Sequence, residues 1–431
     1  MSRPTAQTKT SSRVNPGAPG QLAAHELPAQ TTPVKSRSGP LETLCRILAL
    51  LFVFTVPFEN VLILPVVGTA TRAVGAALAC TWVLQVTRTG RLRRIDRGHV
   101  WAYSFISWSA LTMLWSLNPD TSVIRAVTLI QLFIVLLVLW NTFETQRDMR
   151  AVLRAFLLGA MVVAVLTLFN GLMGNVSLNA RRASIAGTGE NYVGRVLSWG
   201  LPLAWHLFTN RQSGESRFWG LLYGLYIPAA LVAIVFTGSR GSLLATIPFF
   251  VYVAWLATRS GGRQLLRTAI AAIVAAGTLV AFAPTEGIER FATISEEVDE
   301  GGYGDRTVFW ERGMEAISAS PARLMVGYGV GDFQSIGEND AHQTFLEVTV
   351  ELGVIGLGLF ISVLACSLRL VLRMPWRERG MWLALASSWF IGAMAASQEY
   401  HKVTWLVVAF IIGASAAKSE QLGDNTQGGI R

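Results

Sequence analysis

The sequence predicts an all-α polytopic membrane protein with about twelve transmembrane helices and one long loop on the outer side of the membrane. Hydrophobic residues make up 52% of the 431 residues and charged residues only 15%, a balance too apolar for an ordinary soluble domain. The apolar residues also form blocks, such as residues 123–140 and 220–236, that approach or reach the roughly 20 residues a helix needs to cross a bilayer. Basic residues gather in alternate loops between these blocks.

The chain begins with a segment of different character. Residues 1–40 are rich in Ser, Thr, Pro, Gln and Ala, which is typical of a disordered tail, and they contain no secretory signal, so we expect this tail to be cytoplasmic. The apolar segments that follow are predicted to span the membrane at residues 43–58, 67–87, 99–117, 123–141, 150–170, 191–208, 217–237, 241–257, 266–283, 342–372, 381–397 and 401–417. Spans one to nine therefore occupy residues 41–284, and a long outer loop occupies residues 285–341. Spans ten to twelve occupy residues 342–417, and a second cytoplasmic tail occupies residues 418–431.

The short loops predict the orientation, because cytoplasmic loops carry an excess of Lys and Arg. Alternate loops are rich in arginine, namely Arg88, Arg91, Arg93, Arg94 and Arg97, then Arg147 and Arg150, Arg211 and Arg217, Arg259 and Arg263, and finally Arg373, Arg377 and Arg379. Placing these loops inside puts both termini in the cytoplasm. It also explains the formal net charge of +9 without any nucleic-acid partner.

A smaller set of basic residues falls on the predicted outer side, where it does not help orientation. These residues are Arg181, Arg182, Arg195, Arg240, Arg290, Arg306, Arg312, Arg323 and Lys402. An interfacial or intramembrane arginine is a functional-site hypothesis by default. The alternative is that the side chain extends toward lipid headgroups.

The long outer loop is the one predicted soluble segment large enough to shape a site. It starts with an acidic stretch at residues 296–300, which we interpret as solvated, with a divalent-metal site as the alternative. Residues 305–318 are amphipathic and predict a helix with Arg306 at its positively polarised N-terminus, ended by Pro321. Glycines at 327, 329 and 331 allow a tight turn before Asp340 and His342, and His342 is expected to begin the tenth span. There the imidazole is placed for proton transfer, the alternative being a helix cap.

These residues resemble the O-antigen ligase and polymerase superfamily of bacterial membrane glycosyltransferases. Three pieces match in order and spacing: Ser239-Arg240-Gly241, then Arg306 with Trp310 four residues later, then Gly327 to Gly331 followed by His342, Leu346, Glu351, Gly353 and Gly356. The segment from about Asn191 to Leu359 carries this signal, and the other spans agree in number and topology. Gln343 stands where the family more often has Asn.

The resemblance implies a ligase-like membrane glycosyltransferase. Such an enzyme transfers a saccharide from undecaprenyl-diphosphate to an acceptor hydroxyl, on a glycan or lipid A core, at the periplasmic face of the bacterial inner membrane. Arg240 and Arg306 would hold the diphosphate, since guanidinium groups match phosphate oxygens in bidentate fashion. His342 would act as general base in a direct displacement with inversion.

Neither a metal nor another cofactor is expected, because no Asp-x-Asp pair occurs in the outer loops. Further candidates for contact with the substrates, which include membrane lipids, are Arg195, Arg312, Tyr328, Asp340 and Lys402.

Two other functions remain open from the sequence. A polymerase that joins repeat units of an O-antigen or exopolysaccharide shares the same diphosphate chemistry. A transporter or flippase of an anionic lipid or solute would also need arginines within the membrane, but it predicts inverted repeats with broken helices at the midplane. The sequence contains no convincing repeat, and its candidate residues gather at the outer side.

Overall fold

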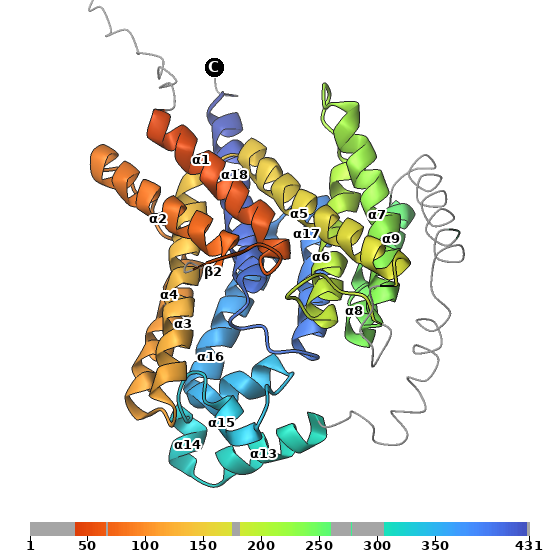
Figure 1. The fold of residues 1–431 in the computed structure, drawn as a ribbon. Coiled ribbons are helices and arrows are strands. Elements are labelled where there is room, and N and C mark those ends of the chain that lie inside the picture. Colours follow the sequence, from red (N-terminus) through yellow and green to blue (C-terminus); the bar gives the residue numbers. More distant parts are fainter. Residues whose placement is uncertain (1–38, 66–67, 175–181, 260–276, 278–305, 429–431) are drawn as a thin grey trace, which may run out of the picture. The chain divides into compact units, whose positions relative to one another are not determined.

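The computed structural model describes residues 39–65, 68–174, 182–259, 277 and 306–428, and these residues are predominantly helical (Figure 1). Several predictions fall outside the described residues: most of the N-terminal tail, the ninth span at 266–283, the acidic start of the long loop, Arg181 and Arg290.

The longer helices are α1 (Pro40–Thr55), α2 (Ala70–Thr89), α3 (Arg97–Leu111), α4 (Pro119–Thr142), α5 (Gln146–Leu172), α6 (Glu190–Thr209), α7 (Arg217–Thr237), α9 (Ile247–Arg259), α13 (Arg306–Ser318), α16 (Thr344–Arg373), α17 (Trp376–Ala393) and α18 (Lys402–Gly428). Shorter elements are the helices α8 (Arg240–Leu244), α14 (Pro321–Val326) and α15 (Phe333–Gly337), the 3-10 helices η1 (Val56–Phe58) and η2 (Thr112–Trp115), and the strands β1 (Ile63–Leu64) and β2 (Gly68–Thr69). The two strands pair antiparallel, with Ile63 opposite Thr69.

The predicted spans coincide with helices wherever the structure describes them, although the eighth span is divided between α8 and α9. Among the described residues, six helical segments are long and apolar enough to cross a membrane: Pro40–Phe58, Pro119–Thr142, Gln146–Leu172, Arg217–Thr237, Arg240–Arg259 and Thr344–Arg373. A shorter apolar stretch covers Lys402–Ala417. The count of twelve spans therefore stays a prediction. Helix α18 continues to Gly428, through most of the segment expected as the second tail.

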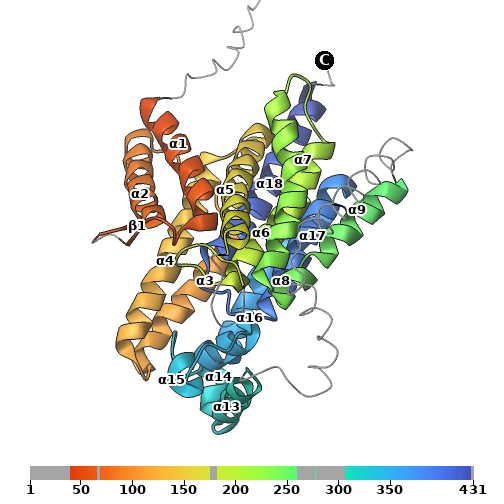
Figure 2. The same cartoon turned by 45° about the vertical axis from the view of Figure 1, so that its right-hand side comes forward.

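Helix α6 lies within the bundle, and Figures 1 and 2 show it among α5, α7 and α17. Its residues from Val193 to Trp205 are all buried. Gly200 lets α7 approach, because a Cβ there would overlap the Tyr226 hydroxyl, which donates a hydrogen bond of 2.8 Å to the carbonyl of Leu197. Small residues that allow such close backbone approach are typical of helix contacts in membranes.

Two ends of the bundle differ in composition. At the end that we call the basic end, Arg46 contacts Asp148, the backbone N–H of Arg93 donates to the Asn141 side chain at 2.9 Å, and arginine-rich segments follow α2, α4, α6 and α16. Arg259 ends α9, and the residues after it lie outside the described residues. This grouping of the loops matches the alternation that the sequence predicts.

The opposite end, which we call the loop end, carries α13, α14 and α15 (Figure 1). Contacts there join segments distant in the sequence. Lys402 pairs with Glu59, and the Tyr192 hydroxyl donates to the carbonyl of Val56 at 3.2 Å. The candidate site residues lie at this end.

Candidate functional site

Three glycines form a tight turn that lets the loop pack against helix α16. Gly327, Gly329 and Gly331 have φ values of 75°, 136° and 85°, so the tight turn expected there is confirmed. The turn brings the N–H groups of Tyr328 and Gly329 to the carbonyls of Val350 and Glu351, at 3.0 and 2.9 Å. The loop is thereby bonded directly to the backbone of α16.

Those carbonyls are available because α16 is broken. Gly353 has a φ of 69° within the helix, so the expectation of one continuous helix over 342–372 is wrong at this point. The carbonyl of Leu352 accepts the indole N–H of Trp108 at 2.9 Å. Only glycine fits the break, because a Cβ at Gly353 would overlap the carbonyl oxygen of Met325 in α14. Gly353 was noted in the sequence as part of a glycine pattern. That it breaks the helix became clear only from its contact with Met325.

A buried carboxylate fastens the loop to the start of α4. Asp332 is fully buried and accepts hydrogen bonds from the Ser116 hydroxyl at 2.9 Å and the N–H groups of Leu117 and Asn118 at 2.7 and 3.0 Å. Three donors satisfy a charge that would otherwise be costly to bury. The loop is therefore anchored on both α4 and α16.

His342 occupies a strained backbone position. Its φ is 51°, and α16 begins two residues later at Thr344, so the expectation that His342 starts the helix is wrong. The side chain of Gln343 caps α16 by accepting the N–H of Leu346. A non-glycine residue in this conformation needs support from its surroundings.

That support comes from hydrogen bonds to the preceding residue. The indole N–H of Trp310 in α13 donates to the carbonyl of Ala341 at 2.7 Å, and the N–H of Ala341 donates to the Glu347 carboxyl at 3.3 Å. Ala341 is fully buried. The backbone at His342 is thus set by two elements, α13 and the first turn of α16.

Arg306 is held by the same helix. It is the first residue of α13, as predicted, and lies four residues before Trp310, which places both on one helix face. Burial lowers the pKa of Arg306, but a guanidinium remains charged in proteins. Trp310 therefore couples the position of Arg306 to that of His342, and this explains the spacing of the sequence motif.

The imidazole of His342 is kept neutral by its surroundings. Burial lowers its pKa below the usual 6.5, and the charges of Arg306 and Arg195 lower that pKa further, while Asp340 partly opposes them. An uncharged imidazole at neutral pH can accept a proton. Arg306, Arg195, Asp340 and His342 thus form one electrostatic group, which we call the His342 cluster.

Arg195 and Arg240 are carried by α6 and α8. Arg195 is buried, and its side chain packs beside Gly392 of α17. Arg240 is half-buried and begins α8, where the next residue, Gly241, packs against Ala395. The helices that carry the two arginines therefore both contact α17 or the residues that follow it.

The remaining candidates differ in their contacts. Arg312 bonds the carbonyl of Gly337 at 3.4 Å and pairs with Glu338 at 2.8 Å, and Tyr328 donates to the carbonyl of Ala316 at 2.9 Å. Those two side chains hold the loop together. Asp340 accepts from Gln334 at 2.8 Å, and Lys402 pairs with Glu59.

A cluster of buried acids was not expected from the sequence. Glu347, Glu351 and Glu399 are each at least 98% buried, with Tyr400 donating to Glu351. The guanidinium of Arg125 lies 4.6 Å from the centre of the Tyr400 ring. Burial and the nearby Glu351 raise the pKa of Glu399 to about 8, so this carboxyl is mostly protonated at neutral pH. Glu347 and Glu351, one helical turn apart in an apolar segment, were the feature of the sequence that could have indicated this cluster.

His401 follows this acid cluster in the loop before α18. Burial and the charges of Arg195, Arg125 and Lys402 lower its pKa to about 3, so the ring is neutral. It packs against Tyr192 with ring centroids 5.5 Å apart. Among the described residues, no group of three or more His, Cys, Asp or Glu side chains is placed to hold a metal ion.

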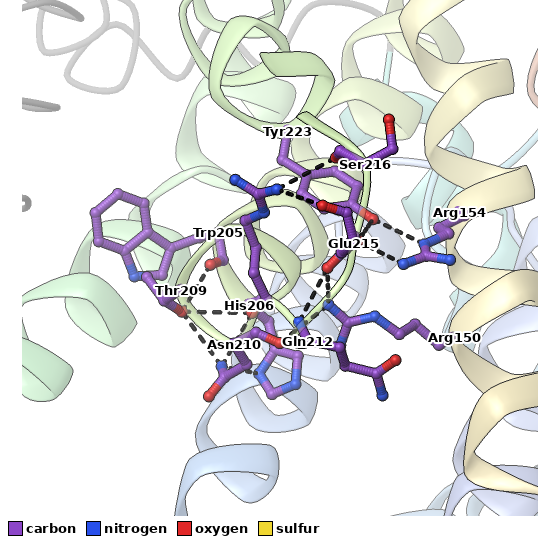
Figure 3. A network of polar contacts seen from close by, with 11 residues as sticks. Arg150, Arg154, Trp205, His206, Thr209, Asn210, Gln212, Glu215, Ser216 and Tyr223 are labelled. Atoms are coloured by element: carbon purple, nitrogen blue, oxygen red, sulfur yellow. Dashed lines mark hydrogen bonds and ion pairs between the residues drawn. The ribbon is translucent and has the colours of Figure 1, made fainter. Parts of the chain in front are cut away.

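The basic end has its own polar network, shown in Figure 3. Glu215 pairs with Arg150 at 3.0 Å and with Arg154, and it accepts the Tyr223 hydroxyl at 2.8 Å. Burial alone would raise the pKa of Glu215, but these partners and the N–H of Gln212 lower it overall. The network joins α5, α6 and α7. Because Glu215 is paired with both arginines and lies away from the His342 cluster, we assign the network to stability.

The fold is that of a helical membrane protein with the candidate arginines and His342 at the loop end, and part of the chain matches a known protein family. Residues 225–361 match the family described as O-Antigen ligase. The resemblance to the O-antigen ligase superfamily is thereby confirmed. The matching segment contains Arg240, Arg306 and His342, whereas Arg195, Glu399 and Lys402 lie outside it.

A particular relative is similar over a longer stretch. The exopolysaccharide production protein ExoQ of Rhizobium meliloti (strain 1021) is 25% identical over 293 residues. The alignment covers 62% of this chain and 63% of ExoQ, so it spans less than two thirds of either protein.

Proposed function

We propose that this chain is a membrane glycosyltransferase of polysaccharide biosynthesis that transfers a saccharide from undecaprenyl-diphosphate to an acceptor hydroxyl. The observation that carries the proposal is the single hydrogen bond from Trp310 to Ala341, which couples Arg306 to His342. In this proposal Arg306 supplies the cation and His342 the neutral base. Transfer from a lipid diphosphate needs both groups.

In this reaction the imidazole of His342 removes the proton from the acceptor hydroxyl. The resulting oxygen attacks the anomeric carbon, and the bond to the diphosphate breaks with its electron pair moving to the phosphate oxygen. Arg306 and Arg240 stabilise the negative charge that develops there, and attack from the opposite face inverts the anomeric centre. This account requires no metal.

Donor binding should also strengthen the base. Arg306 and Arg195 lower the pKa of His342 in the free protein. A bound diphosphate would offset those positive charges, so the pKa of His342 would rise toward neutral pH, where a general base works best. The base would then be most effective when the donor is present.

The acceptor distinguishes two versions of this enzyme. In the ligase-like version the glycan is joined to lipid A core, and in the polymerase version it is joined to another repeat unit. The similarity to ExoQ, whose name refers to exopolysaccharide production, supports the polymerase version.

The test is transfer in proteoliposomes, with a labelled undecaprenyl-diphosphate oligosaccharide offered with and without lipid A core. A ladder of lengthening glycan without core identifies a polymerase, and a single shift onto the core identifies a ligase. Arg306→Ala should lower the rate by about 10² to 10³. Arg312→Ala is the matched control on the same helix and should stay near wild type, because Arg312 contacts only loop residues among the interactions described.

Absence of transfer to either acceptor would contradict the proposal. Movement of the labelled lipid between leaflets by the same proteoliposomes would then favour a flippase.

We further propose twelve spans, cytoplasmic termini and a loop end that faces the periplasm. The distribution of arginines at the basic end supports this orientation. Ser335→Cys at the loop end and Ser213→Cys at the basic end are both exposed positions for labelling, in a variant without Cys45, Cys80 and Cys366. A membrane-impermeant maleimide should label only Ser335→Cys in intact spheroplasts. Labelling of Ser213→Cys alone would reverse the orientation.

A further inference from the structure

A groove lies between α1, α2 and α4, outside the His342 cluster. It is partly open to the outside of the bundle. Figures 1 and 2 place these three helices side by side. Its walls are mainly apolar and include Phe52, Ala76, Leu132 and Val135.

The basic residues of the groove lie toward the loop end. Arg72 and Lys402 line it there, in the first turns of α2 and α18, and Lys402 is paired with Glu59, while Ala79 and Val138 line its deeper part. Thr71 is fully buried and also lines the groove, and its hydroxyl has no hydrogen-bond partner among the described residues. The groove therefore has basic side chains at one end and is mainly apolar along the rest, apart from Thr128 and Gln131 on α4.

This charge pattern complements an amphipathic anion with a hydrocarbon chain. Along α2 the groove extends from Thr71 to Ala79, about 12 Å at the rise of a helix. Along α4 it extends from Thr128 to Val138, about 15 Å. These lengths are about half the thickness of a hydrocarbon layer.

The cationic end adjoins the site. Lys402 directly follows His401, whose ring packs against Tyr192, and Arg195 lies three residues after Tyr192 on α6. Residues three apart share a helix face. A lipid whose phosphate reaches Lys402 would therefore extend its headgroup along this row of residues toward the His342 cluster.

We propose that this groove holds the polyprenyl tail of the lipid-diphosphate donor, with Arg72, Thr71 and Lys402 at its phosphate end. This inference rests on the proposed function, because it names where that substrate enters. It places Lys402 at the phosphate next to the tail, whereas Arg306 and Arg240 are proposed to contact the diphosphate from the side of the saccharide.

The test fills the groove from α2. Ala76→Trp places an indole among the lining residues, whereas Ala77→Trp is the matched control, since the neighbouring Ala77 is exposed and does not line the groove. Val135→Trp fills the groove independently from α4. Unfolding temperatures of the purified full chains establish that each variant is folded.

Native mass spectrometry then measures undecaprenyl phosphate retained in competition with phosphatidylglycerol. Wild type and Ala77→Trp should retain undecaprenyl phosphate, and the folded filling variants should retain about tenfold less, which corresponds to roughly 1.4 kcal/mol. Equal retention by the filling variants would overturn the inference, as would phosphatidylglycerol displacing undecaprenyl phosphate freely from wild type.

A kinetic measurement separates this inference from the proposed function. The KM for an undecaprenyl donor should rise in Ala76→Trp, while the KM for a donor with a two-isoprene tail should not change. An equal rise for both donors would contradict a tail site. If wild type retains undecaprenyl phosphate yet transfers no saccharide to any acceptor, the proposed function fails and the lipid site stands.

Discussion

Replacing Trp310 by Phe tests how the site is held together. The substitution keeps an aromatic ring but removes the N–H that donates to the carbonyl of Ala341 at 2.7 Å. Because Ala341 is fully buried, its carbonyl loses a partner that water does not readily replace. Such a loss costs about 1–2 kcal/mol. If the whole cost falls on the placement of His342, kcat decreases about 5- to 30-fold.

The assay is the initial rate of saccharide transfer in proteoliposomes over a range of donor concentrations. We expect kcat to fall while the donor KM stays within about twofold, because Arg306 remains on α13. Trp115→Phe is the matched control, since the indole N–H of Trp115 is buried and has no hydrogen-bond partner in the part of the chain that the structure describes. A wild-type kcat in folded Trp310→Phe would refute the coupling between α13 and His342.

Three further predictions concern the basic end, the helix break and the pH dependence. Glu215→Gln should lower the free energy of unfolding by about 3 kcal/mol, because it breaks buried pairs with Arg150 and Arg154, while Glu338→Gln, which breaks an exposed pair, should change it little. Equal thermal unfolding of the two variants would contradict this. Gly353→Ala should destabilise the fold by at least about 1–2 kcal/mol and impair transfer, since φ is 69° and a Cβ would overlap Met325. Gly358→Ala, in open space on the same helix, should do neither. The acid limb of kcat/KM should have its midpoint below pH 6.5, because the active neutral form of His342 persists above a lowered pKa. Asp340→Asn should move that midpoint lower still, since Asp340 raises this pKa, and an upward shift in the measured profile would exclude the assignment.

Much of the helical architecture could be predicted from the sequence, because apolar blocks and basic loops follow directly from burial in a bilayer. The helix over residues 306–318 was also predictable from its amphipathic pattern, and α13 covers these residues. The break in α16 was not predictable from the sequence. Gly353 is one of several glycines in an apolar helix, and its role depends on Met325, which is 28 positions earlier in the chain.

The site was predictable in part. Arg306 and His342 were expected from their places in the outer loop and from the family resemblance, and their roles stay predictions. The charge of Arg306 contributes to the lowered pKa of His342. The link through Trp310 and Ala341 could not be predicted, because it joins residues 31 positions apart. Glu399 was missed because a single acid near a helix end usually indicates a solvated surface. Its burial depends on how the loop before α18 folds against α16.

The most direct test of the central claim is the release of undecaprenyl diphosphate during transfer, followed by phosphorus NMR in proteoliposomes containing EDTA. We predict that wild type releases one undecaprenyl diphosphate per saccharide transferred, and that His342→Ala does so about 10² to 10⁴ times more slowly. Release by folded His342→Ala at the wild-type rate would contradict the assignment of His342 as the base. Abolition of wild-type release by EDTA would contradict a reaction that proceeds without metal.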